Sequence, residues 1–499
     1  MARKLTIIAL VVLSAALSQL VGRSSAAPEL ALSPSLAPRA GDLDPSFDRD
    51  GKVITDFGGS ETASAVAVQA DGKVIAAGSA RDPAANTVSF ALARYNRNGN
   101  LDSAFGSGGK VRTDFARPSS ASALSIQPDG RIVVAGDVGI NADFDFALAR
   151  YNRDGTLDST FGIGGKVTTD LSQVDAAYAV AIQADGRIVV AGGTRVAPRD
   201  YDFAVVRYNA NGRLDPSFGG VGAVITPFTP GYDHATAVLV QPDGKLVTAG
   251  VADATPQSTH LALARYNPDG TLDQGFGGDG KVEEAEPGGW GFSIAIQKDA
   301  KLVVADGAGI ARFNANGSPD TGFGSRGKVV LARRAWAYAV LVQSDRKLVV
   351  AGGYQPWPNV DFLVARFQPD GSKDTSFADS GRVTTDLAKS SADLAYAAVL
   401  QPDRRIVVVG STAPDSQSPS DFALVRYLNP APCKVPNVRG KKLALARSAI
   451  MKSHCRVGRV KRKASRKVKR DRVISQSPKA GRQLPNRGRV NLVVSRGRK

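Results

Sequence analysis

The sequence is poor in the residues on which many catalytic and metal sites depend. Its 499 residues include three histidines and two cysteines, and both cysteines lie in the segment 431–499. No nucleophile motif and no glycine-rich phosphate loop stands in a suitable context. Cys433 and Cys455 would need more partners than His454 to hold a metal. These shortages predict a protein that is not an enzyme, with no catalytic residue and no metal centre.

Long apolar runs are also scarce. The run LTIIALVVLSAAL follows Arg3 and Lys4, and the small residues Ser24 and Ala26 precede Ala27. This pattern is typical of an export signal, which we place at 1–26. An uncleaved anchor is the alternative, because the apolar stretch is almost long enough to cross a bilayer. No other segment could span a membrane, so we expect an extracytoplasmic location, secreted or associated with the envelope, in which a disulfide is permitted.

Positive charge is confined to one end of the chain. The net charge is +18, yet residues 431–499 hold 23 Lys and Arg against one acid, Asp471. Residues 27–430 hold 38 bases and 45 acids, a net charge of −7. The sequence therefore divides into a signal (1–26), a linker (27–40), a mildly acidic domain (41–430) and a strongly basic domain (431–499).

One sequence unit recurs seven times between Leu43 and Tyr427. Three markers fix its register, a Phe before G-x-x-G-K-V, a Gln before an x-D-G turn and an Arg in an R-Y/F step. The markers are Phe47, Phe105, Phe161, Phe218, Phe276, Phe323 and Phe377; Gln69, Gln127, Gln183, Gln241, Gln297, Gln343 and Gln401; and Arg94, Arg150, Arg207, Arg265, Arg312, Arg366 and Arg426. The Phe spacings of 58, 56, 57, 58, 47 and 54 indicate one supersecondary unit used repeatedly.

Each unit contains four short apolar runs separated by turn sequences. In the third unit these runs are GKVTTD, AYAVAIQ, RIVVAGG and DFAVVRY. Four antiparallel strands in each of seven units predict an all-β, seven-bladed β-propeller, with an open β-solenoid as the alternative. Closure of the ring would place the first strand, around Lys52–Asp56, in one sheet with the last, around Asp421–Tyr427.

The units resemble the delta-60 repeat family of bacterial secreted proteins. The stretch DFALARYNRDGTLDSTFGIGGKV at Asp145–Val167 carries this resemblance most clearly. It implies a propeller-like fold and says little about activity, because propellers have many functions.

An Arg stands eight residues before an Asp in the repeated R-Y-N-x-x-G-x-L-D element. A position repeated in every blade is better explained by blade architecture than by one active site, so we predict structural ion pairs. A ring of ligand-binding arginines is the alternative. The pairs are Arg94–Asp102, Arg150–Asp158, Arg207–Asp215 and Arg265–Asp273.

The turn Asn152–Gly155, with Asp158 after it, has a weak likeness to a calcium loop. Calcium takes about six to eight oxygen ligands. Other units place Asn98, Asn211 or Asn316 where this turn has Asp154. We expect mostly Asx turns, and no cofactor other than calcium remains open.

Loops of variable length gather on one face of the expected propeller. Counting seven residues back from the marker glutamine gives His234, Trp290 and Trp336 in three consecutive units. His260, Tyr354 and Trp357 are expected in third-strand loops nearby. Variable loops on a rigid scaffold favour binding, so these six residues form a candidate face for a glycan or protein ligand. The alternative is that each tryptophan fills a local packing gap.

The basic end, Cys433–Gly497, resembles a PASTA domain, a small module of bacterial cell-wall proteins. The matching motifs are V-P-N-V-x-G at Val435–Gly440, A-x-x-A-I around Ala446–Ile450, V-I-S-Q-S-P-x-A-G at Val473–Gly481 and V-N-L-V-V-S at Val490–Ser495. The resemblance implies a peptidoglycan ligand, although many copies serve as spacers. Two thiols 22 residues apart in an exported domain most simply form one disulfide, Cys433–Cys455.

A run of positive charge, KRKASRKVKR, interrupts this domain. It is either a solvated loop or an attachment site for an anionic polymer or lipid surface. Nucleic acid is not expected, because the run lacks interleaved aromatics. Its cations are Lys461, Arg462, Lys463, Arg466, Lys467, Lys469 and Arg470.

Together these patterns predict an exported, non-enzymatic binding or scaffold protein of the bacterial envelope. The basic domain would attach it to peptidoglycan or another anionic wall polymer. A polysaccharide-acting propeller enzyme, lyase or hydrolase, and a purely structural surface protein are the alternatives. An enzyme would need acid and base residues that converge at one mouth of the channel.

Overall fold

The structure is a computed structural model. It describes residues 39–498, except 142, 254–258, 285–290, 357–358, 379, 389–390, 415–417, 432 and 485–487. The expected signal at 1–26 lies outside the described residues. Within the part described, no helix combines the length and apolar character that a bilayer span requires.

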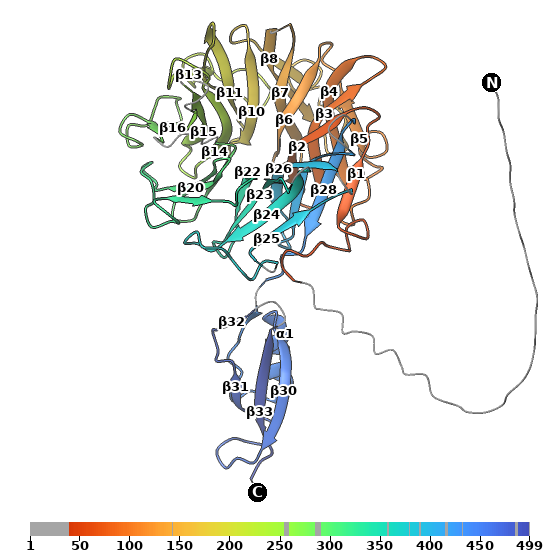
Figure 1. The fold of residues 1–499 in the computed structure, drawn as a ribbon, viewed down its shortest axis with the longest axis vertical. Coiled ribbons are helices and arrows are strands. Elements are labelled where there is room, and N and C mark those ends of the chain that lie inside the picture. Colours follow the sequence, from red (N-terminus) through yellow and green to blue (C-terminus); the bar gives the residue numbers. More distant parts are fainter. Residues whose placement is uncertain are drawn as a thin grey trace, which may run out of the picture. The chain divides into compact units, whose positions relative to one another are not determined.

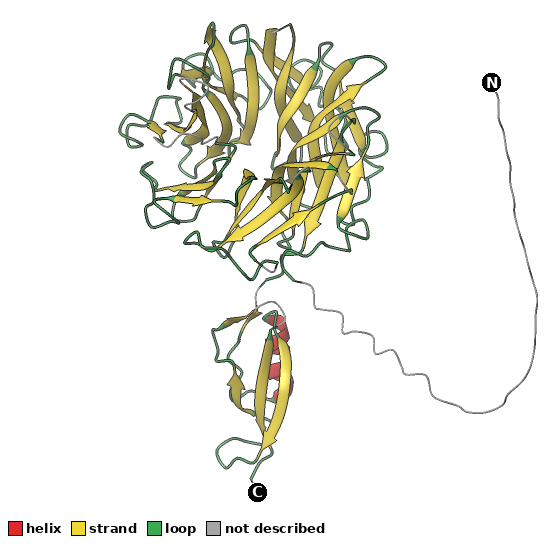
Figure 2. Cartoon of the chain, viewed as in Figure 1, coloured by secondary structure: helices red, strands yellow, loops and turns green. Residues whose placement is uncertain are grey.

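Seven four-stranded antiparallel sheets follow one another around a ring (Figures 1 and 2). The first strands of the sheets contact one another around the axis. They are β2 (Glu61–Val68), β6 (Ser119–Ile126), β10 (Asp175–Ile182), β14 (His234–Val240), β18 (Ser293–Ile296), β22 (Ala335–Val342) and β26 (Ala392–Leu400). The second strands are β3 (Val74–Asp82), β7 (Ile132–Ile140), β11 (Ile188–Ala197), β15 (Leu246–Asp253), β19 (Leu302–Ala305), β23 (Leu348–Tyr354) and β27 (Ile406–Ala413).

The two outer strands complete each sheet. The third strands are β4 (Thr87–Tyr95), β8 (Asp143–Tyr151), β12 (Asp200–Tyr208), β16 (Thr259–Tyr266), β20 (Gly309–Phe313), β24 (Asp361–Phe367) and β28 (Asp421–Tyr427). The fourth strands are β5 (Lys110–Thr113), β9 (Lys166–Thr169), β13 (Ala223–Thr226), β17 (Lys281–Glu283), β21 (Lys328–Val330), β25 (Arg382–Thr385) and β1 (Lys52–Thr55). The predicted seven-bladed propeller is confirmed.

The ring closes through the two ends of the repeat region. Strand β1 pairs antiparallel with β28, from Lys52 opposite Val425 to Thr55 opposite Phe422, and the two lie side by side in Figure 1. The closing sheet is therefore β1-β28-β27-β26. Sequence units and blades are offset by one strand around the whole ring, because each sheet takes its fourth strand from the start of the next sequence unit.

A β-bulge interrupts the pairing of the first and second strands in six of the seven blades. In the third unit the pairing shifts between Ala177 and Ala179, so Tyr178 is the bulged residue. The bulge brings the two backbones together, and a Cβ on Gly192 would lie 1.9 Å from the carbonyl oxygen of Ala176. A bulge re-aims one side chain, here that of Tyr178.

Apolar side chains from neighbouring blades share each core cluster. Ile75 and Leu92 of one blade pack with Ile132 and Val134 of the next, and all four are fully buried. All seven marker phenylalanines are also fully buried. Burial of one such side chain stabilises the fold by about 2–3 kcal/mol, so the blade junctions contain most of the apolar core.

The basic domain has its own core. Helix α1 (Leu443–Lys452) packs Ala446 and Ile450 against Val473 and Val490. Strand β30 (Arg456–Lys463) pairs parallel with β33 (Arg489–Ser495), which pairs antiparallel with β31 (Val473–Ser477). The short strands β29 (Cys433–Lys434) and β32 (Gln483–Leu484) form a second sheet.

Candidate functional site

The shortest blade leaves a pocket on the propeller. Strands β19 and β20 have 4 and 5 residues, whereas β7 and β8 have 9 each. The missing length opens a cavity of about 710 Å³ beside this blade, and Gly307 and Ala308 of the short hairpin line it. Its walls also include Phe292, Trp336 and Tyr338.

Aromatic rings in this pocket contact one another. The ring centroids of Phe292 and Tyr338 lie 4.8 Å apart at an interplanar angle of 70°. Tyr338 also lies 5.9 Å from Tyr396 of the next blade. Burial, and then the neighbouring Tyr396, raises the pKa of Tyr338, so its hydroxyl is neutral and can donate a hydrogen bond.

Two cations border the same pocket. Arg333 and Arg334 are exposed and lie in the turn before β22, next to Trp336. Among the described residues that line the pocket, none carries a carboxylate or an imidazole. The described lining therefore offers aromatic faces and guanidinium donors.

The structure describes four of the six residues of the candidate face. Trp336 is half-buried over Gly353 and lines the pocket. The expectation that Tyr354 lies in a loop is wrong, because it is the last residue of β23 and pairs with Ala335. The Arg382 guanidinium lies 5.1 Å from its ring centroid. Trp290 and Trp357 lie outside the described residues.

The two histidines occupy different surroundings. His234 begins β14 and packs against Tyr178 and Tyr201, with centroids 5.8 and 5.4 Å away. Burial lowers the pKa of His234, so its ring is neutral. The expectation that His260 lies in a loop is wrong, because His260 is the second residue of β16 and its Nδ1 lies 2.7 Å from Glu283.

Sequence reasoning missed the aromatic residues five positions before the marker glutamine. This register holds Tyr178, Phe292, Tyr338 and Tyr396, whereas our count used the position seven before. In the full-length blades it is the bulged position. Counting every register across the seven units would have found these residues.

The predicted ion pairs are present and buried. The Arg Nε lies 2.6–2.8 Å from the Asp Oδ2 in all seven units, including Arg426 with Asp44 across the closure. A second cation binds the same oxygen, for example Lys347 on Asp374 at 2.7 Å. Burial opposes ionisation of Asp374, yet hydrogen bonds from Lys347 and Ser376 and the charge of Arg366 hold its pKa at about 2.

The marker arginines also join consecutive units. Arg207 donates to the carbonyl oxygen of Pro268 and stacks 4.7 Å from the ring centroid of Phe218. In the last step around the ring, Arg426 donates to the carbonyl oxygen of Arg97 at 2.6 Å. These contacts occupy the guanidinium groups and favour a structural role over ligand binding.

The turns with a weak likeness to calcium loops are held by protein donors. Asp154 accepts from the backbone N–H and the hydroxyl of Thr156 at 3.0 and 2.7 Å. Asp158 is bound by Arg150 and Arg131 at 2.8 and 3.1 Å. They are Asx-type turns, and Arg150 and Arg131 already neutralise the Asp158 carboxylate.

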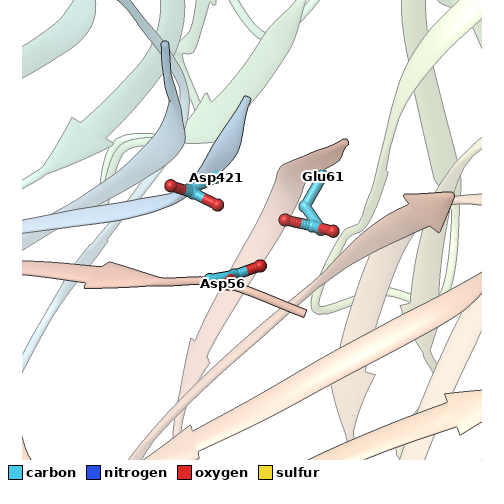
Figure 3. A group of neighbouring side chains, drawn as sticks. All are labelled: Asp56, Glu61 and Asp421. Carbon is cyan, nitrogen blue, oxygen red and sulfur yellow. The ribbon is translucent and has the colours of Figure 1, made fainter. Parts of the chain in front are cut away.

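Three other groups of carboxylates could hold a metal ion. They are Asp56, Glu61 and Asp421; Asp145, Asp170 and Asp175; and Asp361, Asp386 and Asp393, each with ligand oxygens within 4.8 Å of one another. Each group joins the third and fourth strands of one blade to the first strand of the next. In the first group (Figure 3), burial and then the charge of Asp421 raise the pKa of Glu61 to about 7.

The basic domain presents most of its charge to solvent. Cys433 and Cys455 form the expected disulfide. All seven cations of the run at 461–470 are exposed, and the part expected as a loop begins in strand β30, which includes Lys461 to Lys463. A groove of about 480 Å³ on the sheet is lined by Arg459, Lys461 and Arg489 with the polar Asn491.

Comparison with known proteins identifies both parts of the chain. A family model described as a domain of unknown function (DUF5122) β-propeller matches residues 69–105, 127–161, 183–218, 241–276, 299–323, 343–377 and 401–429. A PASTA domain model matches residues 434–496. The matches follow the seven units and the basic domain found in the sequence.

Solved structures show likeness at low identity. The polysaccharide lyase Uly1 is 11% identical over 74% of this chain and 90% of its own, with a TM-score of 0.45. The β-propeller domain of the Trilobed protease from Pyrococcus furiosus is 9% identical over 74% and 94%, with a TM-score of 0.40. The aldose sugar dehydrogenase from Streptomyces coelicolor is 11% identical over 62% and 93%, with a TM-score of 0.37.

The repeat matches and the seven observed blades agree in number and in register. The chain therefore carries a β-propeller with seven DUF5122 repeats, followed by a PASTA domain.

Proposed function

We propose that this protein is an exported, non-enzymatic binding or scaffold protein of the bacterial envelope. Its propeller binds a saccharide in the aromatic pocket beside the short blade, and its PASTA domain attaches the chain to a cell-wall polymer. The pocket with Phe292, Trp336 and Tyr338 is the observation that carries the proposal.

The chemistry of the pocket supports a saccharide ligand. Its volume of about 710 Å³ is within the range of about 300–1,000 Å³ that is usual for small-molecule sites. Aromatic rings offer flat apolar faces to the C–H faces of a sugar ring. Arg333 and Arg334 at the border favour a saccharide that bears a carboxylate, because guanidinium groups bind carboxylates in a bidentate manner.

Wall attachment rests on the PASTA domain and its charge. Its 23 basic residues face one acid, and the groove at Arg459, Lys461 and Arg489 adds a concave basic surface. Peptidoglycan and associated polymers carry carboxylates or phosphates, so attraction to this surface is expected. Exposed charges are screened over about 8 Å at physiological ionic strength, and this component should weaken with added salt.

The pocket is tested by titrating purified full-length chain with neutral and acidic glycans. Trp336→Ala should weaken saccharide binding at least tenfold, since a buried aromatic contact contributes about 2 kcal/mol. Tyr178→Ala is the matched control, because Tyr178 has the bulge register of Tyr338 in a blade that does not line the pocket. Equal loss in both variants, or none in Trp336→Ala, contradicts the assignment.

Attachment is tested by sedimentation with isolated cell walls. Deleting 431–499 should abolish sedimentation, while neutralising the cations of 461–470 should lower affinity and flatten its salt dependence. A chain without its basic domain that sediments as well as the full chain would transfer wall binding to the propeller.

A further inference from the structure

The carboxylates Asp56, Glu61 and Asp421 meet where the propeller closes. Asp56 follows β1, Glu61 begins β2 and Asp421 begins β28. Figure 3 shows the three side chains turned toward a common space. The first two belong to the start of the repeat region and the third to its end, and Ser420 Oγ donates to the Glu61 carbonyl oxygen at 2.8 Å across 359 residues.

The surroundings of the Glu61 side chain provide a second observation that points to a bound ligand. The residue is 1% exposed, and its Oε1 accepts the N–H of Gly59 at 2.7 Å. Its Oε2 is buried and accepts no hydrogen bond from an N–H or hydroxyl donor among the described residues, and the Asp421 carboxyl lies within hydrogen-bond reach of Glu61. A buried polar group without a hydrogen bond lowers the stability of the fold. Because this oxygen faces two other carboxylates, a bound cation would stabilise it.

The equivalent acids at the other two groups are already satisfied. Asp393 accepts from Thr412 Oγ1 at 2.6 Å and from the backbone N–H of Leu387 at 2.7 Å. Asp175 accepts from the backbone N–H of Leu171 at 2.6 Å, and Arg117 neutralises Asp145 in the same group. At the closure, the position of Asp175 and Asp393 is occupied by Glu61. Its side chain is one methylene longer, which places one oxygen beyond the local donors.

No described cation forms an ion pair with Asp56, Glu61 or Asp421. Lys110 and Arg112 approach this region, but they donate to the carbonyl oxygens of Asp56 and Phe57 at 2.9 and 2.8 Å. These lysine and arginine contacts therefore leave the three carboxylates without a counter-charge.

We propose that Asp56, Glu61 and Asp421 bind a hard divalent cation of the Ca²⁺ class, which fastens the first strand of the propeller to its last blade. Two oxygens that share a Ca²⁺ at about 2.3–2.6 Å lie no more than about 5 Å apart, and the three ligand oxygens lie within 4.8 Å of one another. Asp56 is exposed and Asp421 half-buried, so water can complete the coordination that Ca²⁺ requires.

The site is tested by calorimetric titration of chelator-treated, full-length chain with CaCl₂. Glu61→Gln keeps the length of the side chain and removes its charge, and it should weaken one Ca²⁺ equivalent at least tenfold. Asp421→Asn should do the same. Asp114→Asn is the matched control, since Asp114 follows β5 at the register of Asp56, where Ser119 stands at the register of Glu61. It should leave Ca²⁺ binding unchanged.

Hydrogen exchange tests the role in closure. Ca²⁺ should slow exchange in Lys52–Thr55 and Asp421–Tyr427 at least tenfold in the wild type and in Asp114→Asn, but not in Glu61→Gln. The proposal is overturned if Glu61→Gln titrates like the wild type, or if Ca²⁺ protects both chains equally. The proposal is also overturned if no heat of binding is measured up to about 10 mM CaCl₂. In that case a proton shared between the carboxylates satisfies Glu61. Circular dichroism shows whether each variant is folded, and Asp421→Asn replaces Glu61→Gln if the latter is not.

Discussion

Replacing Asp44 with asparagine should weaken the closure of the propeller. Asp44 binds Arg426 at 2.8 Å and Arg405 at 2.7 Å, and the Arg426 and Asp44 side chains are each 3% exposed. In Asp44→Asn the amide oxygen can still accept from Ser46, but the NH₂ group would face two guanidinium donors. Arg426 would then be a buried cation without a counter-charge.

The expected cost follows from this burial. Breaking a buried ion pair by removing one partner costs about 3–5 kcal/mol, whereas an exposed pair contributes about 0–1 kcal/mol. Arg405 is one-third exposed and can be hydrated, so the lower end, about 3 kcal/mol, applies. The measurement is the urea-induced unfolding midpoint, together with hydrogen exchange of Lys52–Thr55.

Asp158→Asn separates closure from local stability. Asp158 binds Arg150 and Arg131, and the Asp158–Arg150 pair is buried to a similar degree as the Asp44–Arg426 pair. Arg150, however, lies only 8 residues from Asp158 in sequence. Both variants should lower the midpoint, and Asp44→Asn alone should speed exchange in Lys52–Thr55. A loss below about 1 kcal/mol in Asp44→Asn, or equal exchange in the two variants, would refute the reasoning.

Three further perturbations test separate parts of the structure. Tyr208→Phe removes the 2.8 Å hydrogen bond between its hydroxyl and Thr169 Oγ1, and it should cost about 1 kcal/mol in chemical unfolding; no change would show that this bond contributes nothing. Replacing Cys433 and Cys455 with serine opens a bridge across 22 residues, and calorimetry should show a basic domain less stable by about 3 kcal/mol with the propeller transition unmoved. Burial raises the pKa of Asp137 to about 6, so the folded chain binds more protons than the unfolded chain between about pH 4 and 6. Its free energy of unfolding should therefore fall as pH rises through this window, by less than about 3 kcal/mol, and Asp137→Asn should remove that part of the fall.

The seven blades and their closure could be predicted because the same residue types return at fixed offsets. The marker Arg and Asp predicted buried ion pairs from spacing alone, and the structure has them in every unit. The boundary of each blade could not be read from the repeat. A unit that begins with GKV supplies the fourth strand of the preceding sheet, and sequence periodicity does not depend on where a unit is taken to begin.

The acidic groups escaped prediction for a topological reason. Asp145 lies in β8 and Asp170 directly after β9 of one blade, whereas Asp175 begins β10 of the next. Their separations in sequence match no local ligand motif, and at the closure the members come from opposite ends of the repeat region. The aromatic pocket escaped for another reason, because it depends on the short hairpin at Gly307 as much as on the rings around it.

Comparison of the seven units within this one chain separates scaffold from candidate site. Positions that are the same in all units, such as the marker Arg and Phe, are buried and join neighbouring blades. The bulged register instead changes from Ser64 and Ser122 to Tyr338 and Tyr396. Fold stability requires the first kind of position in every blade, whereas a ligand needs the second kind in only one sector of the ring. Exchange of Ser64 for a larger side chain should therefore leave the stability of the propeller nearly unchanged. Loss of the Tyr338 side chain should instead weaken ligand binding.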